Sequence, residues 1–158
     1  NIFKLGTKFS DALGLHYVAE NGERFPVVMG SYGIGPARTM GTIVETCNDE
    51  KGIIWPKNIA PYHVHIISLG KEDTIAAESE KLYNLLCANN VETLWDDRPN
   101  VNPGAKFADS DLIGCPIRIT VSSKNLENKQ YEIKRRAGGN AEFIPQENIL
   151  AFLANELK

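Results

Sequence analysis

A glycine-rich turn that runs into a helix is the first segment whose residues could do chemistry. Residues 30–35 read Gly-Ser-Tyr-Gly-Ile-Gly, and Pro36 follows at once. Proline is favoured at the first position of a helix, which would put Arg38 in the first helical turn. Helix N-termini attract phosphate through their exposed N–H groups, and an arginine adds a permanently charged fork. The segment therefore suits a triphosphate tail, although a tight turn with a solvated arginine fits the same residues.

This turn matches neither of two common nucleotide-binding fingerprints. The third glycine of the dinucleotide-binding pattern is missing, because Gly35 is followed by Pro-Ala-Arg. A phosphate-binding loop of the P-loop type is also excluded, since no Gly-Lys-Ser/Thr follows. The chemistry of the segment would then rest on backbone N–H groups and on Arg38.

A second set of polar residues combines a loop at residues 95–98 with Lys106 and a basic tract. The loop reads Trp-Asp-Asp-Arg, and residues 118–136 hold six basic and two acidic residues. Single-stranded RNA is read by stacking and by hydrogen bonds to base edges. Arginine and lysine suit guanine acceptors, and a carboxylate suits guanine donors. A surface Asp–Arg cap and a solvated basic hairpin explain these residues equally well, and Asp96 or Asp97 could simply anchor the loop.

Histidine and cysteine patterns do not indicate a metal site. His63 and His65 alternate on one predicted strand as two zinc ligands would, but no third ligand stands nearby in sequence. The three cysteines are far apart and lack ligand spacing, which is typical of reduced thiols. No run approaches the roughly 20 apolar residues of a membrane helix. The sequence therefore predicts a cytoplasmic protein without a metal site and without a membrane partner.

Periodicity and turn residues predict the elements that must position these groups. Asn21-Gly22 indicates a hairpin between strands at residues 15–19 and 24–29, and a helix follows from residue 36 to about 47. A proline-rich connector at residues 51–61 predicts a domain boundary near Ala60. After it we expect a helix capped by Asp73 and another that ends at Gly114. The later predicted elements are strands 64–69, 91–95, 117–121, 131–135 and 141–144, and helices 74–88, 104–113 and 149–157.

Composition is that of an ordinary globular protein, with 42% apolar and 23% charged residues in a chain of 158. The net charge of −3 argues against a protein that coats nucleic acid generally. It leaves room for a structured RNA bound at a local basic surface, because counterion release depends on where the cations lie.

Several ordered motifs resemble the bacterial-type prolyl-tRNA synthetase family, in its C-terminal part. Residues 29–39, Met-Gly-Ser-Tyr-Gly-Ile-Gly-Pro-Ala-Arg-Thr, resemble motif 3 of class II aminoacyl-tRNA synthetases in its prolyl form. The flanking stretches that also match are residues 2–10, 51–56, 96–98, 106–109 and 111–114. The resemblance covers essentially the whole chain. It implies an α/β fold, with a mixed-sheet three-layer anticodon-binding domain over residues 61–158 preceded by a fragment of the antiparallel class II catalytic domain over residues 1–60.

The resemblance also implies an activity, which is ATP-dependent activation of proline and its ligation to proline tRNA, with Mg²⁺ accompanying ATP. Arg38 would be the catalytic arginine that holds the γ-phosphate, acting by charge. Gly33 and Gly35 would let the backbone approach the adenosine. The expected walls of the proline pocket are Gly30, Ser31, Tyr32, Gly6 and Thr7.

Proline tRNA would be the partner of the second domain. The anticodons of proline tRNAs share two guanines, so the expected readers are Arg98, Lys106 and Asp97. Lys124 and the basic strand would hold phosphates.

Nothing in the chain resembles motif 1 or motif 2 of the family. We therefore expect this chain to be inactive alone, and the full-length enzyme to form a homodimer through regions absent here. An alternative function is a non-catalytic tRNA-binding module or regulatory paralogue. A flavodoxin-like nucleotide domain is a weaker alternative, because residues 69–72 offer little as a phosphate loop.

Overall fold

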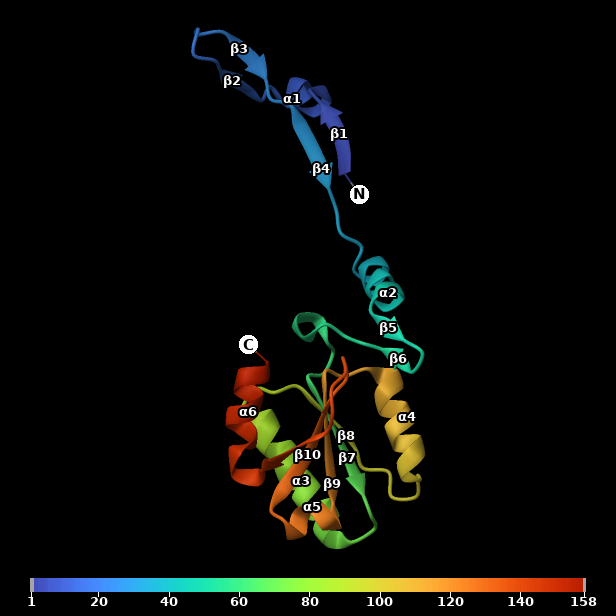
Figure 1. Ribbon diagram of the computed structural model, residues 1–158. Helices are drawn as coiled ribbons and strands as arrows, with labels where there is room; N and C mark the ends of the chain where they lie inside the picture. Colours follow the sequence, from blue (N-terminus) through green and yellow to red (C-terminus); the bar gives the residue numbers. More distant parts are fainter. Residues whose placement is uncertain (1, 158) are drawn as a thin grey trace. The chain divides into compact units, whose positions relative to one another are not determined.

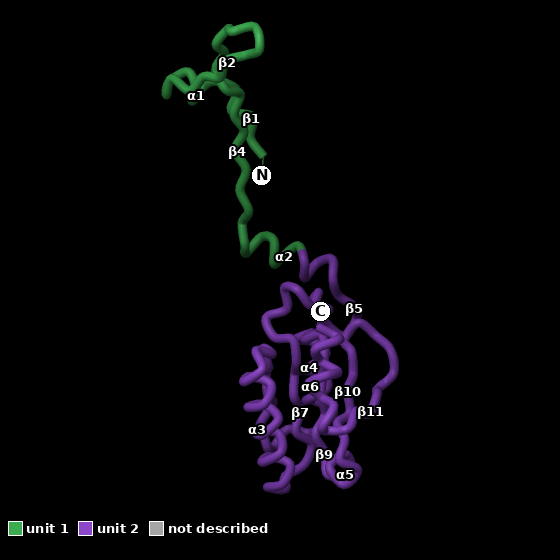
Figure 2. The backbone as a smooth tube through the Cα atoms, turned by 90° about the vertical axis from the view of Figure 1, so that its left-hand side faces the viewer, with its two compact units in different colours: residues 1–42 green, residues 43–158 purple. Residues whose placement is uncertain are grey.

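The computed structural model describes residues 2–157 and divides the chain into two compact units, residues 1–42 and residues 43–158 (Figure 2). The division falls within helix α2 (Pro36–Thr46), so each unit is described separately.

The first unit consists of two small antiparallel ribbons and a short helix. Its elements are β1 (Ile2–Gly6), α1 (Lys8–Leu13), β2 (His16–Val18), β3 (Arg24–Pro26) and β4 (Met29–Tyr32). Strands β2 and β3 pair as the Asn21-Gly22 signal predicted. At that turn Gly22 has φ +83°, and Asn21 Oδ1 accepts a hydrogen bond from the Glu23 N–H at 3.0 Å.

The strand predicted over residues 24–29 is in fact two strands, and Gly30, Ser31 and Tyr32 belong to the second of them. Strand β4 pairs with β1, with Lys4 opposite Gly30 and Phe3 opposite Ser31. The partner strand lies more than twenty residues away in sequence, so no local pattern showed that these residues are extended. The turn before α2 is therefore limited to residues 33–35.

The second unit is built on a five-stranded mixed sheet with the order β11-β10-β9-β7-β8. Strands β7, β8 and β9 are parallel to one another. Strand β10 pairs antiparallel with β9, and β11 pairs antiparallel with β10. The strands are β7 (Val64–Leu69), β8 (Thr93–Asp96), β9 (Ile117–Ser122), β10 (Gln130–Arg135) and β11 (Glu142–Pro145). The α-helices are α3 (Asp73–Ala88), α4 (Pro103–Ile113), α5 (Ser123–Glu127) and α6 (Ile149–Glu156), and short 3₁₀ helices span Lys57–Ile59 and Gln146–Asn148.

Helices α3 and α6 cover one face of this sheet, and α4 lies against the other (Figure 1). The apolar core fills the space under α3 and α6, and its members include Ile66, Ile119, Leu82 and Leu153, each at most 1% exposed. Burying such a side chain stabilises the fold by roughly 1.5–3 kcal/mol. The predicted mixed-sheet α/β arrangement in three layers is confirmed.

Two helix details differ from the predictions. The N-cap position of α3 is Glu72 and not Asp73, and no side chain caps that end. Helix α5 was not predicted, because five residues are too few to show a helical period. It begins after Ser122, whose hydroxyl accepts a hydrogen bond from the Asn125 N–H at 3.4 Å. Helix α4 ends as predicted, at Gly114 with φ +81°.

The predicted connector is firmly packed on the second unit. Its strand β6 (Gly52–Ile53) pairs with β5 (Asn48–Asp49), which lies just before the connector in the chain. Arg136 donates from Nη1 and Nη2 to the Asp49 carboxylate at 2.8 and 2.5 Å, and from Nη2 to the Gly52 carbonyl at 3.0 Å. Trp55 Nε1 donates to the Ile113 carbonyl at 3.0 Å. Residues 43–60 thus pack with the later part of the chain. The domain boundary that the sequence places near Ala60 stays a prediction.

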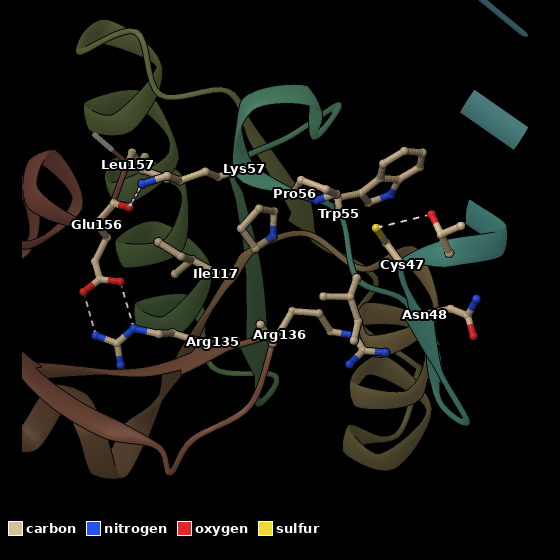
Figure 3. A pocket seen from close by; sticks show the side chains of 14 residues that line it. Cys47, Asn48, Trp55, Pro56, Lys57, Ile117, Arg135, Arg136, Glu156 and Leu157 are labelled. Atoms are coloured by element: carbon tan, nitrogen blue, oxygen red, sulfur yellow. Dashed lines mark hydrogen bonds and ion pairs between the residues drawn. The ribbon is translucent and has the colours of Figure 1, made fainter. Parts of the chain in front are cut away.

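A pocket of about 490 Å³ opens between this segment and the far ends of β10 and α6 (Figure 3). Arg135 and Glu156 form a two-point ion pair on one side of it, with nitrogen–oxygen distances of 2.8 and 2.7 Å. Lys57 Nζ donates to the Glu156 carbonyl at 3.3 Å. Arg135, Glu156 and Lys57 at this pocket thus already have partners within the protein.

Candidate functional site

The loop after β8 is organised by a carboxylate that holds an arginine. Asp96 accepts hydrogen bonds from the Arg98 Nε at 2.9 Å and Nη2 at 2.7 Å, and from the Arg98 backbone N–H at 3.2 Å. These bonds lower the pKa of Asp96 to about 2. Arg98 Nη2 also donates to Asp109 at 2.7 Å, and the Arg98 side chain stays 48% exposed. Asp96 is therefore the loop anchor, one of the two roles considered for it, and it holds Arg98 at the surface.

Lys106 is buried, unlike the exposed base reader that the sequence suggested. Its side chain is only 4% exposed, and Nζ donates to the carbonyls of Ser68 at 2.9 Å and Asp96 at 3.2 Å. The ammonium also lies 3.6 Å from the Asp96 carboxylate. The lysine thus joins the ends of β7 and β8 and has no free path to a base. Helix α4 turns it inward, an orientation that residue spacing alone did not show.

A pocket of about 320 Å³, here called the acidic pocket, lies between β8 and α4. Three of its lining residues are Asp96, Asp97 and Asp109, and Arg98 also lines it and pairs with Asp96 and Asp109. Asp97 is exposed. The rest of the lining includes Leu94, Leu112, Ile113 and His65. Carboxylates, one guanidinium and apolar walls together suit a flat ligand with polar edges, such as a nucleobase.

His65 is a member of this pocket that the sequence did not point to. It is only 2% exposed, and burial lowers its pKa to about 4, so the imidazole is neutral at pH 7. Its Nδ1 has no hydrogen-bond partner among the described residues. The sequence showed only a histidine alternating with His63, which raised the question of a metal and not of a pocket.

The basic tract does not form the open cationic surface that its composition suggested. Arg118 pairs with Asp111 at 2.9 Å and stacks over the Phe107 ring. The other internally paired members are Arg135 with Glu142 and Glu156, Arg136 with Asp49, and Lys134, which donates to the Gly139 carbonyl. Lys124, on α5, is exposed. Three of the six cations of the tract are therefore paired with carboxylates, and Lys134 is bonded to a backbone carbonyl.

In the first unit, Arg38 lies on the rim of an open hollow of about 600 Å³. The hollow is lined by the turn residues Gly33 and Gly35 and by the first turns of α2. Arg38 is exposed, and no carboxylate belongs to the lining. An exposed guanidinium at the start of a helix is suited to a phosphate.

The five residues expected around a proline pocket lie along one ribbon. Gly6 is opposite Met29, next to Gly30 in β4, and Thr7 follows where β1 ends. Tyr32, at the other end of β4, is 85% exposed. Pairing of β1 with β4 thus brings Gly6 and Thr7 near Gly30, while the enclosing walls of a pocket are not formed by the described part of this unit.

Across residues 2–157, no three His, Cys, Asp or Glu side chains lie together in a group that could hold a metal ion. None of the described helices is long and apolar enough to cross a membrane.

Comparison with known proteins matches the second unit to one family. Residues 63–156 match the family described as "Anticodon binding domain". The chain belongs to this family. Similar proteins include a proline–tRNA ligase of Halothermothrix orenii, 50% identical over 139 residues that cover 88% of this chain and 24% of that protein. Proline–tRNA ligases of Bacillus mycoides and Bacillus cereus are 44% and 45% identical over 159 residues, covering 100% of this chain and 28% of each protein.

These relatives confirm the resemblance to prolyl-tRNA synthetases drawn from the motifs. The chain spans only about a quarter of the length of the relatives it matches, between 24% and 28%. The activity of the whole protein is therefore a separate matter from family membership.

Proposed function

We propose that this chain is part of a proline–tRNA ligase and that its second unit reads the anticodon of proline tRNA. The acidic pocket carries this proposal. It is lined by Asp97 and Arg98, whose side chains can hydrogen-bond to base edges, and it lies within the residues that match the anticodon binding domain family. The match to relatives named proline–tRNA ligase favours a synthetase over a non-catalytic module.

The proposed mechanism of reading places one anticodon guanine in the acidic pocket. Asp97, which is exposed, accepts hydrogen bonds from the N1–H and amino group of guanine. Arg98 donates to the guanine O6 and N7 acceptors, with Asp96 and Asp109 fixing its orientation. Lys106 supports the site by joining the Ser68 and Asp96 carbonyls, in place of the direct base contact first expected. Lys124 contacts an RNA phosphate.

The first unit, with the region up to residue 60, would supply a strip of the class II catalytic domain. Arg38 binds the γ-phosphate of ATP and stabilises the charge that develops during activation of proline, while Gly33 and Gly35 line the adenosine side. The hollow has no carboxylate, so its residues fit the phosphate tail and do not fit the Mg²⁺ that accompanies ATP. Gly6, Thr7 and residues 30–32 form one wall of the proline pocket.

The remaining walls, the Mg²⁺ ligands and the homodimer contacts belong to the rest of a longer protein. This chain alone is then inactive in aminoacylation, and the whole enzyme works in the cytoplasm. The two-stranded ribbons of the first unit support the proposal that the rest of the catalytic domain lies in a longer protein. A ribbon of two strands is only marginally stable without a larger sheet.

The test is binding of this chain to a proline tRNA transcript and to a transcript with both anticodon guanines replaced, at one fixed salt concentration. Loss of one well-made base contact costs about 1–3 kcal/mol, so we expect replacement to weaken binding by at least about fivefold. An Arg98→Lys variant should discriminate less than the wild type, because lysine lacks the planar fork. Equal affinity for both transcripts would mean that the anticodon bases are not read and would overturn the proposal.

A further inference from the structure

A second hollow adjoins the acidic pocket and has the opposite charge. It has a volume of about 340 Å³ and is here called the basic pocket. Its charged lining residues are Lys71, Arg98 and Lys106, and its polar lining includes Asn100 and Asn102. No carboxylate belongs to its lining, whereas three line the acidic pocket. The carboxylate of Glu72, the residue after Lys71, lies close to Gly70.

The basic pocket lies where the chain topology favours a ligand. It is lined by the loop that follows β7 and the loop that follows β8, two neighbouring parallel strands. The first loop leads to α3 on one face of the sheet, and the second leads to α4 on the other face (Figure 1). Adjacent strands whose connections leave to opposite faces form a crevice outside their carboxyl ends, and ligands of open α/β sheets bind in that crevice.

Arg98 belongs to both pockets and connects them. Its Nη2 is directed to Asp96 and Asp109 on the acidic side, while its Nη1 has no hydrogen-bond partner among the described residues. Lys106 closes the floor and is fixed by two carbonyls. Lys71 is exposed, and within residues 2–157 it takes part in none of the salt bridges. Lys71 is thus the cation of the basic pocket that is available to a ligand.

We propose that the basic pocket binds the RNA phosphodiester adjoining the nucleotide whose base enters the acidic pocket. Lys71 neutralises this phosphate, and the Asn100 amide donates to it. The two hollows together then accept one nucleotide, with its base among carboxylates and its phosphate among cations. This inference rests on the proposed anticodon reading, and it adds Lys71 and Asn100, which neither the motifs nor the family match pointed to.

The test compares Lys71→Ala with a matched control, Lys81→Ala, in the 158-residue chain. Lys81 is also a lysine of this unit, its side chain is 73% exposed, and it pairs with Glu78 on its own helix. Affinity for an anticodon stem-loop RNA of proline tRNA is measured over a series of salt concentrations. Loss of one phosphate contact should weaken binding and reduce the slope of log affinity against log salt by about 0.7, and the control should leave the slope unchanged.

Position is tested with stem-loops that carry one uncharged methylphosphonate each, in turn around the anticodon. In the wild type, one such substitution next to an anticodon guanine should weaken binding. In Lys71→Ala the same substitution should have a smaller effect than in the wild type, since the charge contact of Lys71 is already lost. Circular dichroism of each variant checks the fold.

The two proposals fail in different ways. If the wild type does not distinguish the guanine-replaced RNA, anticodon reading itself is wrong. If it does distinguish them, but Lys71→Ala and Lys81→Ala have equal salt slopes, the basic pocket holds no phosphate. Additive effects of Lys71→Ala and of every methylphosphonate would likewise refute the contact.

Discussion

Replacement of Asp96 by asparagine should destabilise the second unit far more than the same change at its neighbour Asp97. Asp96 is only 7% exposed and faces two cations, Arg98 at 2.7 Å and Lys106 at 3.6 Å. Asparagine keeps the size and one acceptor oxygen but removes the charge. The Lys106 ammonium then remains buried with carbonyl partners and no counter-charge.

The magnitude follows from the pKa of Asp96, which falls from its ordinary 3.8 to about 2 on folding. A difference of roughly 1.8 units corresponds to about 2 kcal/mol of stability at neutral pH. Removal of one partner from a buried ion pair costs about 3–5 kcal/mol in other proteins. We therefore expect Asp96→Asn to lower the free energy of unfolding by about 2–4 kcal/mol. Asp97→Asn, at an exposed site, should change it by about 0.5 kcal/mol or less.

The contribution of Asp96 to the free energy of unfolding should depend on pH with a definite sign. Because folding lowers the pKa of Asp96, its contribution is fully present above about pH 5 and is lost as the pH falls toward 2. The difference between wild type and Asp96→Asn should therefore be about 1 kcal/mol smaller at pH 3 than at pH 6. A group with a raised pKa would give the opposite trend.

Urea unfolding measures both effects, followed by far-ultraviolet circular dichroism and by the fluorescence of the two tryptophans, of which Trp95 lies in the same strand as Asp96. The slopes against urea should agree among the variants, so that midpoints report stability. Equal stabilities of Asp96→Asn and Asp97→Asn at pH 6, or a difference between wild type and Asp96→Asn that grows toward acid, would refute the buried carboxylate as an anchor.

Two further predictions concern other parts of the chain. Gly114→Ala should destabilise the second unit by about 2–4 kcal/mol in urea unfolding, because Gly114 has φ +81° and a methyl group there would lie 2.1 Å from the Ile53 carbonyl oxygen. The control Gly139→Ala, with φ +88° and open space around it, isolates the cost of the backbone angle and should be clearly milder. In a full-length proline–tRNA ligase that carries this segment, Arg38→Ala should slow proline-dependent ATP–pyrophosphate exchange by about 100-fold or more. Arg24→Ala, an exposed arginine of β3, serves as its control, and similar rates for both variants would exclude a phosphate role for Arg38.

Local signals in the sequence were sufficient for most elements of the second unit. Strand β7 and the end of α4 at Gly114 follow the predicted bounds, since apolar runs and a left-handed glycine act within a few residues. The motif around Arg38 and the family also came from sequence, because they depend on residue order alone. A short helix such as α5, by contrast, leaves no periodic signal.

Tertiary structure alone decided which charges are available. Asp49 and Arg136 are 87 residues apart, yet their ion pair fixes the connector to the second unit and removes one cation from the basic tract. Lys106 faces two carbonyls because α4 packs across the ends of β7 and β8, which its position in sequence does not show. Sequence determined the kinds of groups present and their local conformation. The pairing of distant strands and helices determined which of them are buried and neutralised, and it left Asp97, Arg98 and Lys71 among the polar groups that are exposed.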